Sequence, residues 1–327
     1  MKSPVVSGQG SGVSRNKTKI VVIIGPTASG KSKVALELAE RFNGEIISAD
    51  SMQVYRYMDI GTAKPSREDQ ERIRHHLIDI RDPDEGFDAA QFRDEASKAI
   101  REIVDKGDLP FVAGGTGLYI KALTEGIFDA PVSDEEIRER LKKEAEEAGL
   151  SSLYNKLRDV DPEAAEKIGP ANTHRIIRAL EIYYMTGHPI SQHHKEHAFP
   201  ERPYYVLKIG LYAERETLYK NIDYRVDCMI RAGFVDEVKR ILEMGYGPDL
   251  KGMQAIGYSH ICKHIKGEYN LEGSVSLIKR DTRHYAKRQM TWFRRDNEIT
   301  WFDVGKEGYI GNIFSEVGRF AGQTLHP

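Results

Sequence analysis

The amino-acid sequence predicts an α/β fold in which a parallel sheet is flanked by helices and an all-helical domain is inserted. Two observations lead to this prediction. Strand-like segments alternate with helical apolar patterns in the first part of the chain, which is typical of a doubly wound parallel sheet. The strand pattern then disappears between residues 132 and 197 and returns at residue 204. In such a sheet the ligands are expected at the carboxyl ends of the strands.

The elements of the core are predicted in order along the sequence. Short runs rich in β-branched residues predict strands at 19–24, 44–49, 75–80 and 109–115. Apolar residues at helical spacing predict helices at 31–42, 66–74 and 88–105. After the insertion, the same signals predict a strand at 204–213, helices at 214–231, 233–243 and about 274–294, and a last strand at 298–304.

These patterns divide the chain into three parts. Residues 1–18 are polar and without periodicity, so a disordered leader is expected there. Residues 19–131 and 198–327 are predicted to form the core, which contains the phosphate-binding motif described below. Residues 132–197 are predicted to form the helical insertion, because all of their apolar patterns have helical spacing.

Composition excludes several classes of protein. The 327 residues are 40% hydrophobic, which is adequate for a proper core, and the formal net charge is −2. Two cysteines, Cys228 and Cys262, are too few for a disulfide framework or a cysteine zinc site. No apolar run approaches the length needed to span a membrane, and the amino-terminal segment lacks the apolar centre of a signal peptide. We expect a cytoplasmic monomer without membrane contact, in which any nucleic-acid binding comes from a local basic patch.

The segment "IGPTASGKS" matches the pattern G-x-x-x-x-G-K-[ST], known as a P-loop. Backbone N–H groups of such a loop point into one concavity that holds phosphate, and the lysine reaches the outer phosphate. A strand precedes the motif and an amphipathic helix follows it, which favours this interpretation over a flexible turn. The predicted phosphate-binding residues are Gly25, Pro26, Thr27, Ala28, Ser29, Gly30, Lys31 and Ser32. Ser32 is the natural ligand for magnesium.

Two further strand ends lie at the same predicted edge of the sheet. Asp50 follows the second strand, where a carboxylate can bind magnesium, accept a proton or cap the next helix. The strand at 109–115 ends in Gly114, Gly115 and Thr116, at the position where a P-loop hydrolase usually keeps an acidic residue. This absence disfavours a motor or a GTPase.

Basic residues gather on three predicted helices. Arg225 follows a sheet strand and can reach a phosphate, or it can form an ordinary ion pair on a polar helix face. Arg175 and Arg178 share one face of a helix in the insertion. Arg280, Arg283, Lys287 and Arg294 form a stripe on the last long helix, with Ile278, Tyr285, Gln289 and Trp292 across from it. Such a stripe binds nucleic acid in some proteins and is merely solvated in others.

Together these motifs resemble the tRNA dimethylallyltransferases, also called tRNA isopentenyltransferases. The resemblance covers nearly the whole ordered chain and rests on the order and spacing of "IIGPTASGKS", "DSMQVYR", "GTAKPS", "AGGTGLYI", "NTHRIIRALEIYYMTGHPIS", "YRVDCMIRAGFVDEV", "QAIGYSH" and "TRHYAKRQMTWFRR". This family transfers a dimethylallyl group from dimethylallyl diphosphate to N6 of adenine 37, next to the anticodon of tRNA. The chain ends without the cysteine/histidine zinc finger of many eukaryotic relatives, which implies the bacterial type.

The resemblance also implies roles for individual residues. Asp50 would be the general base, Thr116 and Arg225 would act at the reacting centre, and the P-loop with Mg²⁺ at Ser32 would hold the diphosphate. The adenine would be received by Asp50, Ser51, Met52, Gln53 and Thr116. The tRNA anticodon stem-loop would be contacted by Arg138, His174, Arg175, Ile176, Ile177 and Arg178 of the insertion and by Lys287 and Arg288.

Three alternatives stay open at this point. A P-loop kinase of a nucleoside or small metabolite would also use the loop and its basic helices. An adenylate isopentenyltransferase would use the same donor with a free nucleotide, but would have little need of the helical insertion. A tRNA-binding module with a vestigial P-loop is disfavoured, because Lys31, Ser32 and Asp50 are all present.

Overall fold

The computed structural model describes residues 17–127, 134–196 and 202–322. It divides into two compact units, one formed by Met1–Thr124 and Pro203–Pro327 and the other by Glu125–Arg202. The predicted insertion, 132–197, falls within the second unit. Most of the predicted leader lies outside the described residues, and Thr18 already belongs to the first strand.

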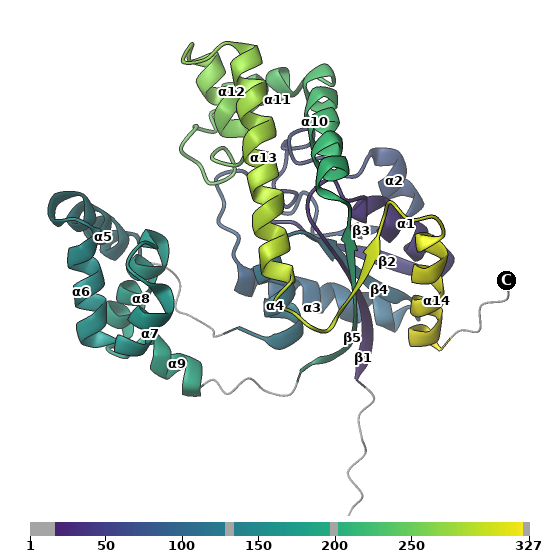
Figure 1. Cartoon of the computed structure of the whole chain (residues 1–327), viewed down its shortest axis with the longest axis horizontal. Coiled ribbons are helices and arrows are strands. Elements are labelled where there is room, and N and C mark those ends of the chain that lie inside the picture. Colours follow the sequence, from purple (N-terminus) through teal and green to yellow (C-terminus); the bar gives the residue numbers. More distant parts are fainter. Residues whose placement is uncertain (1–16, 128–133, 197–201, 323–327) are drawn as a thin grey trace, which may run out of the picture. The chain divides into compact units, whose positions relative to one another are not determined.

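The first unit is built on a six-stranded parallel sheet in the order β3-β2-β4-β1-β5-β6 (Figure 1). Its strands are β1 (Thr18–Ile24), β2 (Gly44–Ala49), β3 (His75–His76), β4 (Leu109–Gly114), β5 (Tyr204–Tyr212) and β6 (Ile299–Asp303). The predicted fold class, a P-loop-containing parallel sheet with a helical insertion, is confirmed. The parallel direction places the ends of β1, β2, β4 and β5 at one edge of the sheet.

Helices cover both faces of this sheet, and its central strands are mostly apolar and buried. Helices α1 (Lys31–Arg41) and α14 (Tyr309–Ala321) share one core with the sheet, and α3 (Ala89–Asp105) packs against β2 and β4 from the opposite side (Figure 1). Helix α3 begins with a capping box, in which Asp88 accepts from the backbone N–H of Gln91 and the side chain of Gln91 accepts from that of Asp88.

Four helices lie beyond the carboxyl edge of the sheet (Figure 1), and residues of these helices line the cavities there. They are α10 (Arg215–Arg231), α11 (Phe234–Glu243), α12 (Tyr258–Ile265) and α13 (Leu271–Phe293). Helices α10 and α13 lie side by side, and Leu218, Ile222 and Ala286 are buried where they meet. Since α10 follows β5 directly, its second and third turns lie near the P-loop, at the carboxyl edge of the sheet.

The third strand differs from its prediction. The sequence predicts six strand residues at 75–80, but β3 contains only His75 and His76. The chain leaves the sheet because Leu77 and Asp79 adopt positive φ angles of 63° and 56°. A left-handed residue cannot continue a strand. Helix α2 (Arg67–Arg72), which precedes it, is also shorter than predicted.

The second unit consists of helices around a core of its own. They are α5 (Glu135–Ala148), α6 (Leu150–Val160), α7 (Pro162–Ile168), α8 (Thr173–Thr186) and α9 (Ile190–Glu196). Leu141, Leu153, Leu157, Ile176 and Leu180 are buried together in this core. Asp161 caps α7 by accepting from the backbone N–H of Ala164, and Pro162 begins that helix as expected for its fixed φ.

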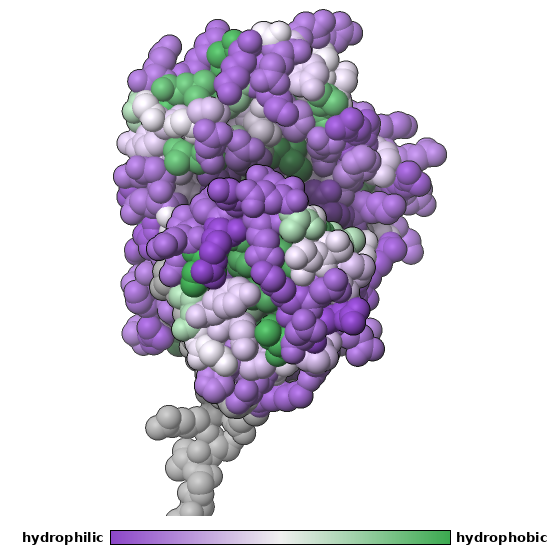
Figure 2. Space-filling view, turned by 90° about the vertical axis from the view of Figure 1, so that its left-hand side faces the viewer, coloured by the Kyte–Doolittle hydropathy of each residue, from purple (hydrophilic) through white to green (hydrophobic). Residues whose placement is uncertain are grey.

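On the face shown in Figure 2, hydrophilic side chains prevail and the hydrophobic ones form small, separate patches. Within the described ranges, none of the helices combines the length and the apolar character that crossing a bilayer requires.

Candidate active site

The P-loop forms a concave turn between β1 and α1. Gly25 has a φ angle of 150°, and a Cβ atom there would lie 2.4 Å from the carbonyl oxygen of Leu211 on the neighbouring strand. Gly30 stands at the N-cap of α1 in the left-handed conformation and offers no side-chain cap. The first N–H groups of α1 are therefore open to an anion, which the positive end of the helix dipole also attracts.

Lys31 and Ser32 line a cavity of about 300 Å³ in front of this loop, together with Asn221 and Arg225 of α10. In this structure the Nζ of Lys31 donates to the carbonyl oxygen of Pro26 at 2.7 Å. Burial and, to a smaller extent, the nearby charge of Arg225 lower the pKa of Lys31 to about 7, although the charge of Asp50 acts in the opposite direction. An arriving diphosphate would favour the charged ammonium form.

Asp50 follows β2 and also caps the turn behind it. Its Oδ1 accepts from the backbone N–H of Met52 at 2.9 Å and from that of Gln53 at 3.4 Å. Asp50 therefore caps this turn and not the next helix, whose N-cap is Ser66, and the two bonds orient its carboxylate. Both of these bonds reach the same oxygen, and Asp50 also lines a second cavity.

Thr116 stands next to Asp50 at the end of β4. Its Oγ1 accepts from the backbone N–H of Ser51 at 3.2 Å, so the ends of β2 and β4 are joined. Ser51 and Met52 line the same cavity as Asp50. Gln53 is not among the described residues that line it. Its amide accepts from Ser48 Oγ at 2.8 Å and donates to the carbonyl oxygens of Thr62 and Ala63, so Gln53 shapes the turn behind the site.

Arg225 lines both cavities, the one in front of the P-loop and the one beside Asp50. Burial lowers its pKa, and Asp50 is the charge that opposes this shift. The sequence offered an ordinary surface ion pair as an alternative. In the structure the acidic neighbour on its own helix, Asp223, is instead paired with Arg283 of α13 at 3.0 Å. The position of Arg225 between two cavities thus favours a role in the site.

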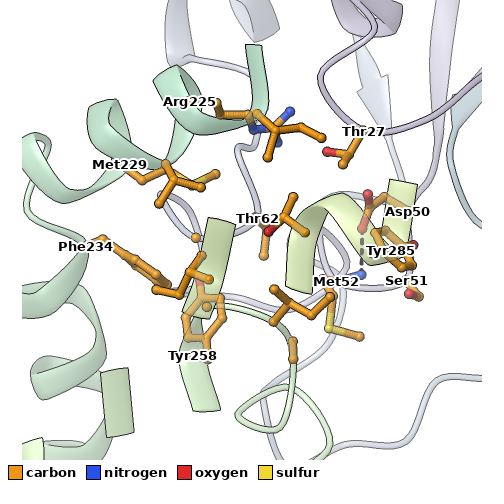
Figure 3. Close-up of a pocket in the computed structure, with 18 of the residues that line it drawn as sticks. Thr27, Asp50, Ser51, Met52, Thr62, Arg225, Met229, Phe234, Tyr258 and Tyr285 are labelled. Atoms are coloured by element: carbon orange, nitrogen blue, oxygen red, sulfur yellow. Dashed lines mark hydrogen bonds between the residues drawn. The ribbon is translucent and has the colours of Figure 1, made fainter. Parts of the chain in front are cut away.

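The second cavity has a volume of about 350 Å³ and is largely apolar. Figure 3 shows Thr27 and Arg225 near each other, Asp50 beside Tyr285, and Phe234 and Tyr258 farther along the wall. The other described lining residues are Ser51, Met52, Gly61, Thr62, Ile222, Val226, Met229, Gln254, Ala255, Ile256, Gly257, Ile278, Thr282 and Arg288. Charged groups at one end and an apolar remainder suit a flat or aliphatic group attached to a phosphate.

One wall of this cavity is held by the buried carboxylate of Glu237 on α11. This side chain accepts from three consecutive backbone N–H groups, those of Asp59, Ile60 and Gly61, at 2.7–3.1 Å. It also accepts from the Tyr258 hydroxyl at 2.7 Å. Four donors compensate for the burial of its charge, and they fix the turn that carries Gly61 and Thr62 into the cavity wall.

A family model described as IPP transferase matches residues 53–296, which is most of the chain. The chain belongs to the IPP transferase family. The family resemblance stated from the sequence motifs is thereby confirmed, as is the prediction of a prenyl-transferring enzyme.

Relatives of this IPP transferase are similar over nearly their whole length. A tRNA dimethylallyltransferase 2 of Geotalea uraniireducens is 54% identical over 288 residues, 88% of this chain and 93% of the relative. A tRNA dimethylallyltransferase of Geobacter metallireducens is 51% identical over 304 residues, 93% and 98% of the two chains.

Two crystal structures are also similar. The tRNA isopentenylpyrophosphate transferase of Bacillus halodurans is 43% identical with a TM-score of 0.70, and the match covers 94% of this chain and 97% of that one. A eukaryotic dimethylallyltransferase, described as acting on tRNA, is 29% identical with a TM-score of 0.79, and the match covers 95% and 81%.

In this IPP transferase the basic residues predicted to form a stripe on α13 differ in whether they have an acidic partner. Arg283 is paired with Asp223, and Arg280 with Asp281 on its own helix. Lys287 and Arg288 are exposed, and within the described ranges neither is paired with a carboxylate. Arg288 also lines the cavity beside Asp50. Lys287 and the neighbouring Arg288 therefore have charge available to an RNA, as does Arg294 of the stripe, which is exposed at the end of α13.

The residues of the second unit that were predicted to contact RNA also differ in their exposure and in their partners. His174 and Arg175 are exposed at the start of α8. Arg138 and Arg178 both donate to the buried carboxylate of Glu181, at 3.1 and 2.8 Å.

Ile176 and Ile177 were predicted to contact the tRNA together with these residues, and this stays a prediction. Their side chains are only 0% and 7% exposed, because they belong to the core of this unit. They hold the helix in place.

Some residues that line or contact the site in the structure were given no such role from the sequence. Thr27 was predicted only as part of the P-loop, yet it also lines the cavity beside Asp50. Gly257 and Tyr258 belong to "QAIGYSH", a motif noticed without a role. Gln289 was placed on the core-facing side of α13, and its actual partners are the P-loop and β4, since it bonds to Thr27 and Gly115.

Proposed function

We infer that this chain transfers a dimethylallyl group from dimethylallyl diphosphate to N6 of adenine 37 in tRNA, next to the anticodon. The observation that supports this most is the position of Arg225 between two cavities. One of them has the P-loop lysine and open helix N–H groups for a diphosphate. The other has the Asp50 carboxylate in largely apolar surroundings, as an adenine acceptor requires.

In the proposed reaction, the bond between C1 of the dimethylallyl group and the diphosphate oxygen breaks, and a bond from C1 to N6 forms. The allylic carbon tolerates positive charge, so the main barrier is the negative charge that grows on the leaving diphosphate. Lys31, the N–H groups at the start of α1 and Arg225 are placed to stabilise this charge. Donors that are fixed before the reaction stabilise a transition state without reorganisation.

Asp50 is the proposed general base. The N6 amino group of adenine is a weak nucleophile because its lone pair is delocalised into the ring, and it loses a proton as it attacks. Asp50 would accept this proton while its capping bonds to Met52 and Gln53 hold it in place. The substrate adenine must leave its stack to reach the cavity, which costs a few kcal/mol and least in a loop.

The donor set fits a magnesium ion that enters with the diphosphate. The described residues contain no group of three or more His, Cys, Asp or Glu that could hold a metal by themselves. The Ser32 hydroxyl, at the exposed rim of the P-loop cavity, would supply one ligand, and diphosphate oxygens and water the others. When bound, magnesium neutralises part of the charge on the leaving group.

The experiment that tests this function uses unmodified tRNA with an adenine at position 37. The protein is incubated with this tRNA, magnesium and dimethylallyl diphosphate, and the nucleosides are analysed by mass spectrometry. We expect one dimethylallyl group on that adenine. Transfer to free AMP but not to tRNA would indicate the adenylate isopentenyltransferase, and consumption of ATP with a small acceptor would indicate the kinase. No described residue lining the P-loop cavity is a carboxylate, which supports the transferase over the ATP-dependent kinase.

Lys287 and Arg288 give a prediction about salt. If both contact RNA phosphates, replacing both by Ala should weaken binding of an anticodon stem-loop and reduce the log–log salt slope by about one to two units, since each lost contact removes slightly less than one. The measurement is fluorescence anisotropy at several salt concentrations. The matched control replaces Lys239 and Arg240, an exposed Lys-Arg pair on α11. Equal slopes for the two double variants would contradict the contact.

Lys31 gives a prediction about pH. Its pKa of about 7 in the free protein means that the ammonium form is lost as the pH rises above 7. A bound diphosphate stabilises the ammonium form. The affinity of the wild-type protein for diphosphate should therefore fall relative to that of a Lys31→Arg variant, by up to about tenfold per pH unit above 7. Calorimetry with inorganic diphosphate and magnesium between pH 6.5 and 9 measures this ratio. A ratio independent of pH would mean that Lys31 is already charged throughout this range.

A further inference from the structure

The side chain of Gln289 connects three elements of the proposed site. It projects from α13 and is only 7% exposed. Its Oε1 accepts from the backbone N–H of Thr27 in the P-loop at 2.8 Å, and its Nε2 donates to the carbonyl oxygen of Gly115 at the end of β4 at 3.0 Å. The orientation of the amide is fixed by these partners, because a backbone N–H only donates and a carbonyl only accepts.

Each partner of Gln289 carries a group of the proposed site. Thr27 lines the cavity beside Arg225 and Asp50 (Figure 3). Gly115 is followed by Thr116, whose Oγ1 accepts from the N–H of Ser51, the residue next to Asp50. One buried amide therefore lies between the loop proposed to hold the donor and the turn proposed to receive the adenine.

The side chain of Gln289 is tightly packed against its neighbours. A Cβ atom at Gly115 would lie 2.1 Å from the Nε2 of Gln289, so the close approach of the amide requires glycine there. A turn farther along α13, Trp292 occupies the space where a Cβ atom of Gly117 would lie, 2.2 Å from its ring. The helix thus comes close to Gly115, two residues before α4 (Gly117–Glu125), and to Gly117, its first residue, and a Cβ atom at either glycine would displace a side chain of α13.

We propose that Gln289 is a positioning residue for the transfer reaction, which holds the P-loop and the Thr116 turn at the separation that the donor carbon and the adenine nitrogen require. The proposal rests on the proposed function. No other common side chain of similar length provides an acceptor and a donor at one end: glutamate only accepts when ionised, and methionine does neither. Lys287 and Arg288 lie on the same turn of α13, so this bond also ties the proposed RNA contacts to the donor site.

The test uses two variants of nearly the same shape. Gln289→Met removes both hydrogen bonds, and Gln289→Glu keeps only the acceptor while the introduced carboxyl is ionised. Gln289→Met also removes the side-chain hydrogen bond between Gln289 and Tyr285, which lines the cavity beside Asp50. We expect Gln289→Met to lower kcat for tRNA prenylation by about 10- to 100-fold per folded molecule, with KM for tRNA changed less than about threefold, because small misplacements of reacting groups cost up to about 100-fold. Thermal unfolding monitored by circular dichroism gives the folded fraction. Thr291→Val, which removes a hydrogen bond within α13 at an exposed position, is the control and should keep wild-type kcat.

Gln289→Glu provides a measurement, the pH dependence of kcat, that would not change if the role of Gln289 were purely structural. A protonated carboxyl has a donor and an acceptor, as the amide does, and burial raises the pKa of a carboxyl. The ratio of kcat between this variant and wild type should therefore rise as the pH falls from 8 to 6. A wild-type kcat for folded Gln289→Met, or a ratio independent of pH, would overturn the proposal. So would a failure of both variants to fold, since the side chain would then serve folding itself. If wild type modifies no tRNA, the proposed function fails, which is a separate result.

Discussion

Replacing Asp50 by Asn is expected to lower the rate of dimethylallyl transfer by about 10²–10⁴-fold, the range typical for the loss of a general base. Asparagine keeps an oxygen in the place of Oδ1, so it can still accept from the N–H groups of Met52 and Gln53. The turn should therefore keep its shape while the group can no longer take the proton from N6. Single-turnover kinetics with saturating tRNA and dimethylallyl diphosphate measure the chemical step directly.

A second variant, Asp50→Ala, separates the two roles of this carboxylate. If Asp50 acts as the base, Ala and Asn should be similarly slow, and only Ala should also lower the melting temperature because it removes the cap. If Asp50 is only a cap, Asn should be close to wild type and Ala alone should be impaired. Binding of inorganic diphosphate, which does not require this side chain, serves as the control for an intact P-loop.

Much of the fold follows from local sequence patterns, because the period of the apolar residues differs between strands and helices. In β1 the buried residues Ile20–Ile24 form a continuous β-branched run, and β2, β4 and β5 contain shorter apolar runs. The prediction failed at β3, where the apolar residues Leu77 and Ile80 suggested a strand but positive φ angles end it. Apolar periodicity carries no information on such backbone conformations.

The candidate site could be predicted in part, for a related reason. Asp50, Thr116 and the P-loop each follow a strand, so the rule that carboxyl ends meet at one edge is enough to bring them together. Gln289 lies more than 170 residues from Gly115 in sequence, and only the packing of α13 reveals that they touch. Arg138 and Arg178 were recognised as basic, but their shared partner Glu181 is a tertiary feature that helical spacing alone did not show.

Replacing Arg225 by Ala is expected to lower the rate of transfer by about 10²–10³-fold, the scale measured for a donor that stabilises charge growing in a transition state. The side chain lines both the P-loop cavity and the cavity beside Asp50, so its charge acts where the bond between donor carbon and diphosphate oxygen breaks. In the described structure its acidic neighbours on α10 have other partners: Asp223 is paired with Arg283, and Asp227 is paired with Lys279. Its charge is therefore available to the diphosphate.

The matched control for this experiment is Arg231→Ala, which removes an exposed arginine at the end of the same helix that itself lines neither cavity. Arg225→Lys keeps a positive charge but not the planar array of donors, and we expect it to recover only part of the lost rate. The loss should appear in kcat more than in the affinity for inorganic diphosphate, since the interaction strengthens as the leaving group gains charge. Equal rates for Arg225→Ala and Arg231→Ala, measured in single turnovers at saturating substrates, would show that Arg225 does not stabilise the leaving diphosphate and that Lys31 and the N-terminus of α1 suffice.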